Sequence, residues 1–295
     1  MEEIRKLTEQ LFGDTPKELL YHYTTLTGLL GIVGSNKLWA SDIRYMNDSA
    51  ELKHSADLIR VEVQERLAKG QGTADLLGQF VDWVAYRITN GHMLFGASFR
   101  SHGNLLSQWR GYSTHGKGVS LGFSADYIVE CARKQHFQIG KCIYDPVRQR
   151  QLIAKVVDAI EHNVAHQVRG GETCEELSGL YHLVFEKIEI DLLRIAAILK
   201  HPSFREEKEW RIVSPVLISR TESSLLFREA NAMLVPYVEF ELQLAVGQPP
   251  QLDHCYLGPT SNINISMNSL QMFLGQHGIV PAKGIDYCQI PYRQR

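Results

Sequence analysis

The chain has 295 residues, 44% of them hydrophobic, which supplies a full-sized core and excludes general disorder. Its 31 Lys and Arg residues are balanced by 33 Asp and Glu residues, so no overall positive charge draws the protein to nucleic acid or anionic lipid. No apolar run is long enough to cross a bilayer, and the N-terminus lacks the apolar stretch of a signal peptide. We therefore expect a cytoplasmic protein with no membrane partner.

The cysteines argue against a disulfide or zinc scaffold. They are Cys131, Cys142, Cys174, Cys255 and Cys288. Their number is odd, their spacing is wide and no CxxC pair occurs. We expect reduced thiols that are mostly buried.

The N-terminal half of the chain predicts short strands alternating with helices. Helical periodicity covers about residues 4–12, 26–33, 49–69 and 74–89. Strand-like apolar runs cover 19–24, 37–40, 93–99 and 118–123, and the glycine-rich stretch from 103 to 118 is expected to be a loop.

The C-terminal half predicts two long helices followed by strands. The helices cover about residues 147–167 and 175–199, and the second ends before His201-Pro202 because proline disrupts a continuing helix. Strand candidates are 141–144, 210–213, 235–240, 255–259 and 290–293. Since no repeat or linker divides the sequence, we expect one α+β domain over residues 1–295, with a mainly helical insertion at about 145–200.

The common catalytic signatures are absent. The P-loop, HExxH and GxSxG motifs do not occur, and the glycines between 103 and 122 lack the strand-to-helix context of a dinucleotide fingerprint. Four other blocks of polar residues remain as candidates.

The first block is Tyr21-His22-Tyr23-Thr24. In a strand, His22 and Thr24 share one face and the two tyrosines share the other, so the polar pair can face a cleft while the tyrosines pack. The alternative is a core histidine that is hydrogen-bonded to a backbone carbonyl.

The second and third blocks combine cations with amides or aromatic rings. Arg44 to Asp48 places a cation, Asn47 and a carboxylate in one turn, although Asn and Asp also occur in turns for backbone reasons. Residues 108–112 place Gln, Trp, Arg and Tyr together, which suits a flat ring and a phosphate. The alternative for the third block is a loop that buried aromatic rings hold in place.

The fourth block is the charged run that leads into Trp210. Period-2 geometry puts Glu207, Glu209 and Arg211 on one side of a strand, and Trp210 and Ile212 on the other. Two carboxylates and a guanidinium then line one surface; the alternative is a solvated charged face.

Together these blocks resemble a widespread bacterial family of unknown function. The matching stretches are 21–24, 29–30, 38–39, 47–48, 107–112, 118–119, 201–204, 207–211 and 290–293. More remotely, the order of elements is similar to the ADP-ribosyltransferase superfamily, which includes DNA-modifying toxins of toxin–antitoxin systems. This resemblance implies a mixed, mostly antiparallel split β-sheet flanked by helices, with NAD as substrate.

The resemblance also implies roles for individual residues. His22 matches the first-strand histidine that hydrogen-bonds the ribose and carboxamide of NAD, and Glu209 matches the catalytic glutamate. Glu207 forms an ExE pair with Glu209. The remaining expected contacts to NAD are Tyr23, Thr24, Asn47, Arg211, a nicotinamide-stacking ring from Trp109 or Tyr112, and a pyrophosphate-binding cation from Arg44 or Arg110.

The chemistry explains why these residue types go together. Cleavage of the nicotinamide–ribose bond builds positive charge on the ribose, which an ionised Glu209 stabilises. Arg211 keeps the pKa of Glu209 low. We therefore expect His22 and Glu209 to meet in one cleft of an ADP-ribosyltransferase or NAD glycohydrolase. The resemblance further implies a toxin or phage-defence role, with an antitoxin or defence-system protein as partner. The acceptor stays open between a protein, a nucleic acid and a small molecule.

Two other functions remain open at this point. One is a non-enzymatic protein that senses nucleotides or binds a partner. The other is a nuclease or phosphoesterase that holds Mg²⁺ or Mn²⁺ with Glu207, Glu209 and either His201 or His22.

Overall fold

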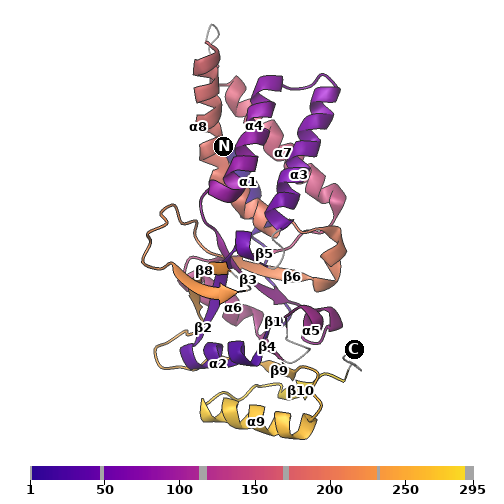
Figure 1. Ribbon diagram of the computed structural model, residues 1–295, viewed down its shortest axis with the longest axis vertical. Helices are drawn as coiled ribbons and strands as arrows, with labels where there is room; N and C mark the ends of the chain where they lie inside the picture. Colours follow the sequence, from indigo (N-terminus) through magenta and orange to yellow (C-terminus); the bar gives the residue numbers. More distant parts are fainter. Residues whose placement is uncertain (1, 47–49, 113–117, 169–172, 231–232, 290–295) are drawn as a thin grey trace.

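The protein has a helical bundle at one end and a β-sheet at the other (Figure 1). The computed structural model describes residues 2–46, 50–112, 118–168, 173–230 and 233–289. The helices are α1 (Glu2–Leu11), α2 (Leu26–Ser35), α3 (Ala50–Ala68), α4 (Ala74–Asn90), α5 (Leu106–Tyr112), α6 (Ala125–Lys134), α7 (Pro146–Ala165), α8 (Cys174–Ile198) and α9 (Ile263–Gln276), with short 3-10 helices η1 (Ile43–Tyr45) and η2 (Pro202–Glu207).

The strands form one mixed, mostly antiparallel sheet. They are β1 (Leu20–Thr24), β2 (Lys37–Asp42), β3 (Phe95–Arg100), β4 (Val119–Phe123), β5 (Gln138–Lys141), β6 (Glu209–Val213), β7 (Leu226–Ala230), β8 (Met233–Glu241), β9 (His254–Leu257) and β10 (Ile285–Tyr287). Their order is β10-β9-β4-β1-β3-β2-β8-β7, with β6 and β5 branching from β3. Among these strands, only β9 and β10 pair in parallel.

The sheet divides along one edge of β3. Arg100, at one end of β3, pairs with Tyr21 of β1, and Gly96, near the other end, pairs with Ser41 of β2. Both residues also pair with β6. Because a strand has only two edges, β1 and β2 share the edge opposite β6, and they leave Ala97, Ser98 and Phe99 between them. The two strands therefore separate next to Ser98.

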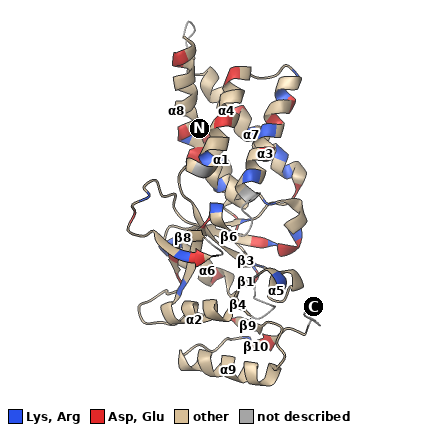
Figure 2. Ribbon diagram, viewed as in Figure 1, with Lys and Arg blue, Asp and Glu red and all other residues tan. Residues whose placement is uncertain are grey.

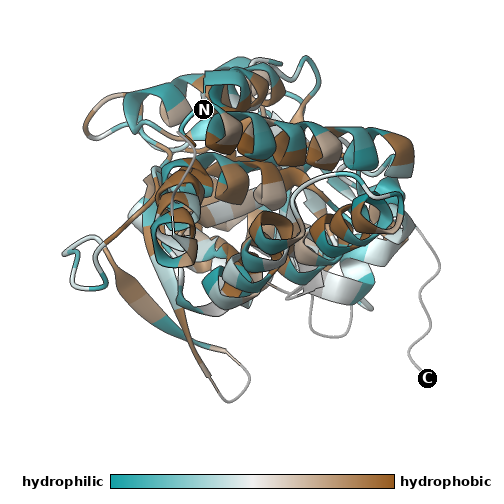
Figure 3. Cartoon of the chain, turned by 90° about the horizontal axis from the view of Figure 1, so that it is seen from above, coloured by the Kyte–Doolittle hydropathy of each residue, from teal (hydrophilic) through white to brown (hydrophobic). Residues whose placement is uncertain are grey.

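Two hydrophobic cores stabilise the two ends. The sheet core joins the strands to α2, α6 and α9. The bundle core joins α3, α4, α7 and α8 to α1. The bundle helices alternate hydrophobic and hydrophilic stretches, as expected for helices that bury one side (Figure 3). The expected helical insertion at about 145–200 is α7 and α8, and it packs with α1, α3 and α4, so three separate segments build one bundle.

Most of the predicted elements are confirmed, and two predictions are wrong. The strand expected at 141–144 lies at Gln138–Lys141 instead, and α5 occupies part of the expected glycine-rich loop. The helices α6 and α9 and the strands β7 and β10 were not predicted. The expected strand at 290–293 lies outside the described residues.

Expectations about cysteines and membrane spans are also testable on the structure. Four of the five cysteines are buried, none is in a disulfide, and Cys174 is exposed. Within the described ranges, no helix combines the length and hydrophobicity that crossing a membrane requires.

Candidate functional site

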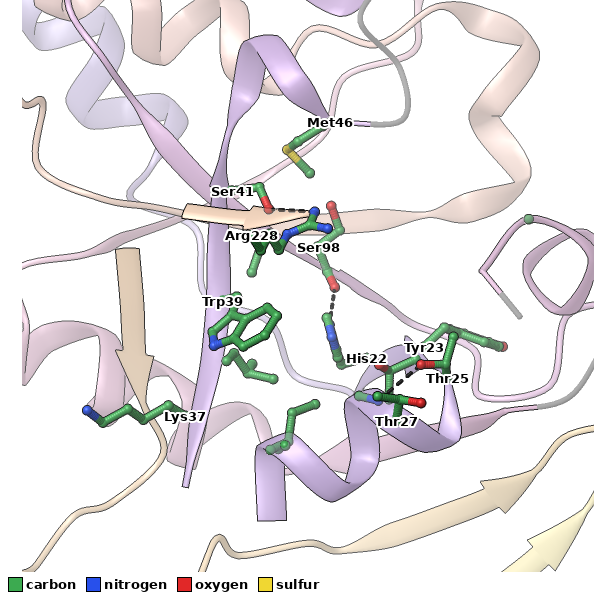
Figure 4. Close-up of a pocket in the computed structure, with 18 of the residues that line it drawn as sticks. His22, Tyr23, Thr25, Thr27, Lys37, Trp39, Ser41, Met46, Ser98 and Arg228 are labelled. Atoms are coloured by element: carbon green, nitrogen blue, oxygen red, sulfur yellow. Dashed lines mark hydrogen bonds between the residues drawn. The ribbon is translucent and has the colours of Figure 1, made fainter. Parts of the chain in front are cut away.

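A cavity of about 470 Å³ lies where β1 and β2 separate. Its walls come from β1, β2, β3, the first turns of α2 and Arg228 of β7 (Figure 4). The helix α2 begins directly after β1 because Thr25 caps it and accepts a 3.0 Å hydrogen bond from the backbone N–H of Gly28. Local sequence therefore places the strand, the cap and the helix around one opening.

His22 and Thr24 line this cavity from the same face of β1, as the strand pattern predicts. The Nδ1 atom of His22 lies 3.1 Å from the carbonyl oxygen of Ser98. Since a carbonyl only accepts, Nδ1–H donates this hydrogen bond and Nε2 is left as an acceptor. Burial, with a smaller contribution from Arg100, lowers the pKa of His22 below its ordinary 6.5. The imidazole is therefore neutral at pH 7.

The tyrosines of β1 pack away from His22. The hydroxyl of Tyr23 donates to the carbonyl of His102 at 2.8 Å and accepts from the N–H of Leu105 at 2.9 Å. Its ring packs edge-on against Trp109, with centroids 4.9 Å apart. Tyr23 thus borders the cavity, but its polar atom is used to hold the loop before α5.

Trp109 does not line the cavity. Its side chain is buried in the cluster with Tyr21 and Tyr23, and its indole N–H donates to Asn104 at 2.8 Å. A ring in this position stabilises the loop, which is the alternative that the sequence left open for this block. The nicotinamide-stacking role expected for Trp109 has no support in this placement.

Glu209 is fully buried behind Ser98 and is not part of the cavity wall. Its carboxylate contacts three cations: Lys200 at 2.7 Å, Arg211 at 2.8 Å and Arg100 at 3.1 Å. Burial alone would raise the pKa of Glu209, but these cations hold it well below its usual range. Ser98 donates a 2.5 Å hydrogen bond to the same carboxylate. His22 and Glu209 are thus connected through Ser98 and do not meet directly.

Glu207 belongs to the same buried network. It lies at the end of η2, one residue before Lys208, which has a left-handed backbone, and not in the strand. Lys200 and Arg100 contact its carboxylate at 2.7 Å and 2.9 Å. Glu207 and Glu209 therefore form neither a solvated face nor the lining of the cavity; they join β6 to β3 and to the end of α8.

The other residues expected to contact NAD are dispersed. Arg44 borders the bundle and forms an ion pair with Asp42 at 2.5 Å, and Arg110 is exposed on α5; neither lines the cavity. Asn47 and the side chain of Tyr112 lie outside the described residues. Arg211 is buried and contacts Glu209.

The cavity wall contains residues that the sequence reasoning did not single out as a site. These are Lys37, Trp39, Ser41, Ser98, Arg100 and Arg228, and Tyr45 of the second block lines the cavity as well. Within the described part of the wall there are three cations, Lys37, Arg100 and Arg228, and no Asp or Glu. Period-2 alternation in β2 could have placed Trp39 and Ser41 on one face, whereas no sequence signal brings β7 to β2.

Comparison with known proteins gives one match. Residues 108–212 match the family model described as protein of unknown function (DUF2971). This match confirms the expected resemblance to a family of unknown function. The DUF2971 segment includes Lys200, Glu207, Glu209 and Arg211, whereas His22, Ser98 and Arg228 lie outside it. No curated protein and no solved structure matches the chain.

Proposed function

We propose that this protein binds NAD in the cavity between β1 and β2, in the manner of an ADP-ribosyltransferase-like protein. The observation that carries the proposal is the wall of this space of about 470 Å³, in which no described carboxylate takes part and Arg228 has no carboxylate partner among the described residues. Ligand pockets typically measure about 300–1,000 Å³, and a wall of this charge favours an anionic ligand.

The polar and aromatic groups of the wall suit a nucleotide. Trp39 and Tyr45 are large exposed rings on the wall, and such rings stack on flat bases. His22 keeps Nε2 as an acceptor for a ribose hydroxyl or a carboxamide N–H. These contacts agree with the role that the resemblance gives to His22.

A second cavity is less suited to such a ligand. It measures about 370 Å³ and lies between α2 and α9, and its described wall has no charged side chain. Figure 2 shows that α2 and α9 carry no charged residue. Phosphate groups would find no cation there, so we assign the nucleotide to the cavity between β1 and β2.

Cleavage of the nicotinamide–ribose bond is the enzymatic form of the proposal. It is supported by the ionised Glu209 and by Ser98, which lines the cavity and whose hydroxyl donates to Glu209. In this arrangement Ser98 contacts the ligand, and Glu209 acts as a positioning residue that orients the hydroxyl.

The non-enzymatic form of the proposal is nucleotide binding without turnover. It is favoured by the position of Glu209, because a fully buried carboxylate that contacts three cations has no direct access to the ligand. A cytoplasmic location, an acceptor macromolecule and a role as toxin or defence effector stay predictions under either form.

The metal-dependent nuclease finds no comparable support. Both Glu207 and Glu209 are bridged by Lys200 and Arg100, and these cations repel a metal ion at the same oxygens. In the described ranges, no cluster of three or more His, Cys, Asp or Glu side chains has the geometry of a metal site.

The test is to titrate the purified protein with NAD by calorimetry and to follow nicotinamide release in the same samples. Binding together with release supports the enzymatic form, and binding without release supports the non-enzymatic form. His22→Gln should weaken binding, whereas Glu130→Gln, an exposed change on α6, should not. If the wild-type protein does not bind NAD, the proposal is wrong.

A further inference from the structure

We infer that Arg228 of β7 is the phosphate-binding residue of this cavity, and that the β7–β8 hairpin is therefore part of the ligand site. The inference rests on the proposed function for the identity of the nucleotide. It adds the ligand chemistry, which is a phosphate or pyrophosphate group, and the residue that recognises it.

Arg228 lines the cavity and makes one hydrogen bond to the part of the chain that the structure describes. One of its terminal nitrogens donates to the hydroxyl of Ser41 at 3.2 Å. The described residues place no carboxylate within ion-pair distance of Arg228. A guanidinium has five N–H donors, so most of its hydrogen-bonding capacity is left for a ligand.

The other two cations of the wall are already committed. Lys37 contacts Glu239 at 2.6 Å, and Arg100 contacts Glu207 and Glu209. Arg228 differs because a neutral hydroxyl is its partner. Burying a guanidinium without a counter-charge is unfavourable, and burial accordingly lowers the pKa of Arg228 from its ordinary value. An anionic ligand in the cavity would supply the missing charge.

The position of Arg228 also fits a ligand that reaches across the cavity. In the view of Figure 4, Arg228 lies beside Ser41 and Ser98, with Trp39 and His22 below them. Trp39 packs against Tyr237 of β8, with ring centroids 4.7 Å apart. A ligand held at its phosphates by Arg228 therefore has an aromatic ring on one side and His22 on the other.

The planar guanidinium is suited to this role because it binds two phosphate oxygens at once. The hairpin fixes its direction: Arg228 pairs with Val235 of β8, and β8 pairs along β2 from Lys37 to Ser41. The hydrogen bond to Ser41 of β2 directs the side chain over the cavity. Because lysine lacks the planar guanidinium, Arg228→Lys should recover only part of the binding.

The test measures binding of inorganic pyrophosphate, NAD and adenosine to the wild-type protein, to Arg228→Gln and to Arg228→Lys. We expect Arg228→Gln to weaken binding of pyrophosphate and NAD by about 10- to 100-fold and to leave adenosine unaffected. Arg60→Gln, which removes an exposed arginine on α3, is the matched control and should bind like the wild type. Thermal unfolding of each variant verifies that it is folded.

The outcomes separate this inference from the proposed function. If NAD binds and Arg228→Gln binds pyrophosphate and NAD as tightly as the wild type, the inference is wrong and the proposed function stands. If pyrophosphate binds in an Arg228-dependent way but NAD does not bind, the phosphate site stands and the proposed function fails. If the wild type binds neither ligand, both are wrong.

Discussion

The hydroxyl of Ser98 donates a 2.5 Å hydrogen bond to Oε1 of Glu209, and it is the point where the cavity meets the buried charge network. Ser98 lines the cavity, whereas Glu209 is completely buried. An influence of Glu209 on a ligand therefore passes through Ser98 or through Arg100, which also lines the cavity and contacts Glu209 at 3.1 Å. Ser98 and Glu209 have different expected roles, which substitution can separate.

Glu209→Gln is expected to destabilise the protein strongly. It leaves Lys200, Arg100 and Arg211 buried around a neutral amide, and removal of one partner from a buried ionic network costs about 3–5 kcal/mol. Urea unfolding of the variant and the wild type measures this difference. Glu130→Gln breaks an exposed pair with Arg133 and is the control, for which we expect no measurable change.

This result also decides how loss of activity should be interpreted. If Glu209→Gln unfolds at a much lower urea concentration, loss of nicotinamide release by that variant shows nothing about catalysis. Ser98→Ala keeps the three cations on Glu209 and removes only the hydroxyl, so it is the cleaner test of the cavity. A Glu209→Gln variant as stable as the wild type would contradict the network described here.

The low pKa of Glu209 predicts acid sensitivity. Because the pKa is lower in the folded than in the unfolded chain, its pairing stabilises the fold above pH 4.5. That contribution is lost as the pH falls below 4.5 and through the pKa of the folded state. We therefore expect the contribution of Glu209 to the free energy of unfolding to stay constant from pH 7 down to about pH 4.5 and to decrease below it. Unfolding experiments between pH 7 and pH 3 measure this change. A carboxyl resonance of Glu209 that titrates near 4.5 in the folded protein would refute the prediction.

The face of β1 shows what the sequence predicts well. Alternation along residues 21–24 places His22 and Thr24 together because side chains of a strand alternate between its faces, whatever lies around them. The cavity beside them was not predictable, because it depends on where β2 leaves β3. That separation is a property of pairing between distant strands.

The charged run at β6 shows a property that the local sequence does not predict, which is the burial of its carboxylates. The local sequence pattern correctly places Glu207 and Glu209 near each other. Whether they face solvent depends on which cations pack against them from other parts of the chain. These cations are Arg100, at the end of β3, and Lys200, which follows α8, and they are about a hundred residues apart in the chain. Arg228 is a similar case, since β7 reaches the cavity only through its pairing with β8 and the pairing of β8 with β2.

His22 is expected to be a neutral imidazole with the proton on Nδ1 at pH 7. Burial lowers its pKa below 6.5, so the folded state disfavours the proton relative to the unfolded chain. The resulting contribution to stability is complete above pH 6.5 and is lost as the pH falls towards the pKa of the folded state. Nitrogen-15 NMR of the ring measures both the tautomer and the pKa. A ring that is protonated at both nitrogens at pH 7 would contradict this assignment.

Gly28 of α2 is expected to control the shape of the cavity through Thr24. A Cβ at position 28 would overlap the hydroxyl of Thr24, whereas a Cβ at position 34 of the same helix meets no atom within 4 Å. Gly34→Ala should therefore gain up to about 1 kcal/mol of stability from the better helix former. Gly28→Ala should lose part of that gain, displace Thr24 and weaken NAD binding. Equal binding by the two variants would show that Thr24 does not shape the ligand site.

Trp39 is expected to report ligand binding by its fluorescence. Of the four tryptophans, Trp83, Trp109 and Trp210 are buried, whereas Trp39 is 50% exposed and lines the cavity. A base that stacks on Trp39 should quench its emission and protect it from iodide, since the ligand then covers the indole ring. Trp39→Phe keeps an aromatic ring and removes the signal, so this variant should bind NAD, measured by calorimetry, with little change in fluorescence. If the Trp39→Phe variant shows the same quenching as the wild type, the ligand binds near a different tryptophan, and the cavity between β1 and β2 is not its site.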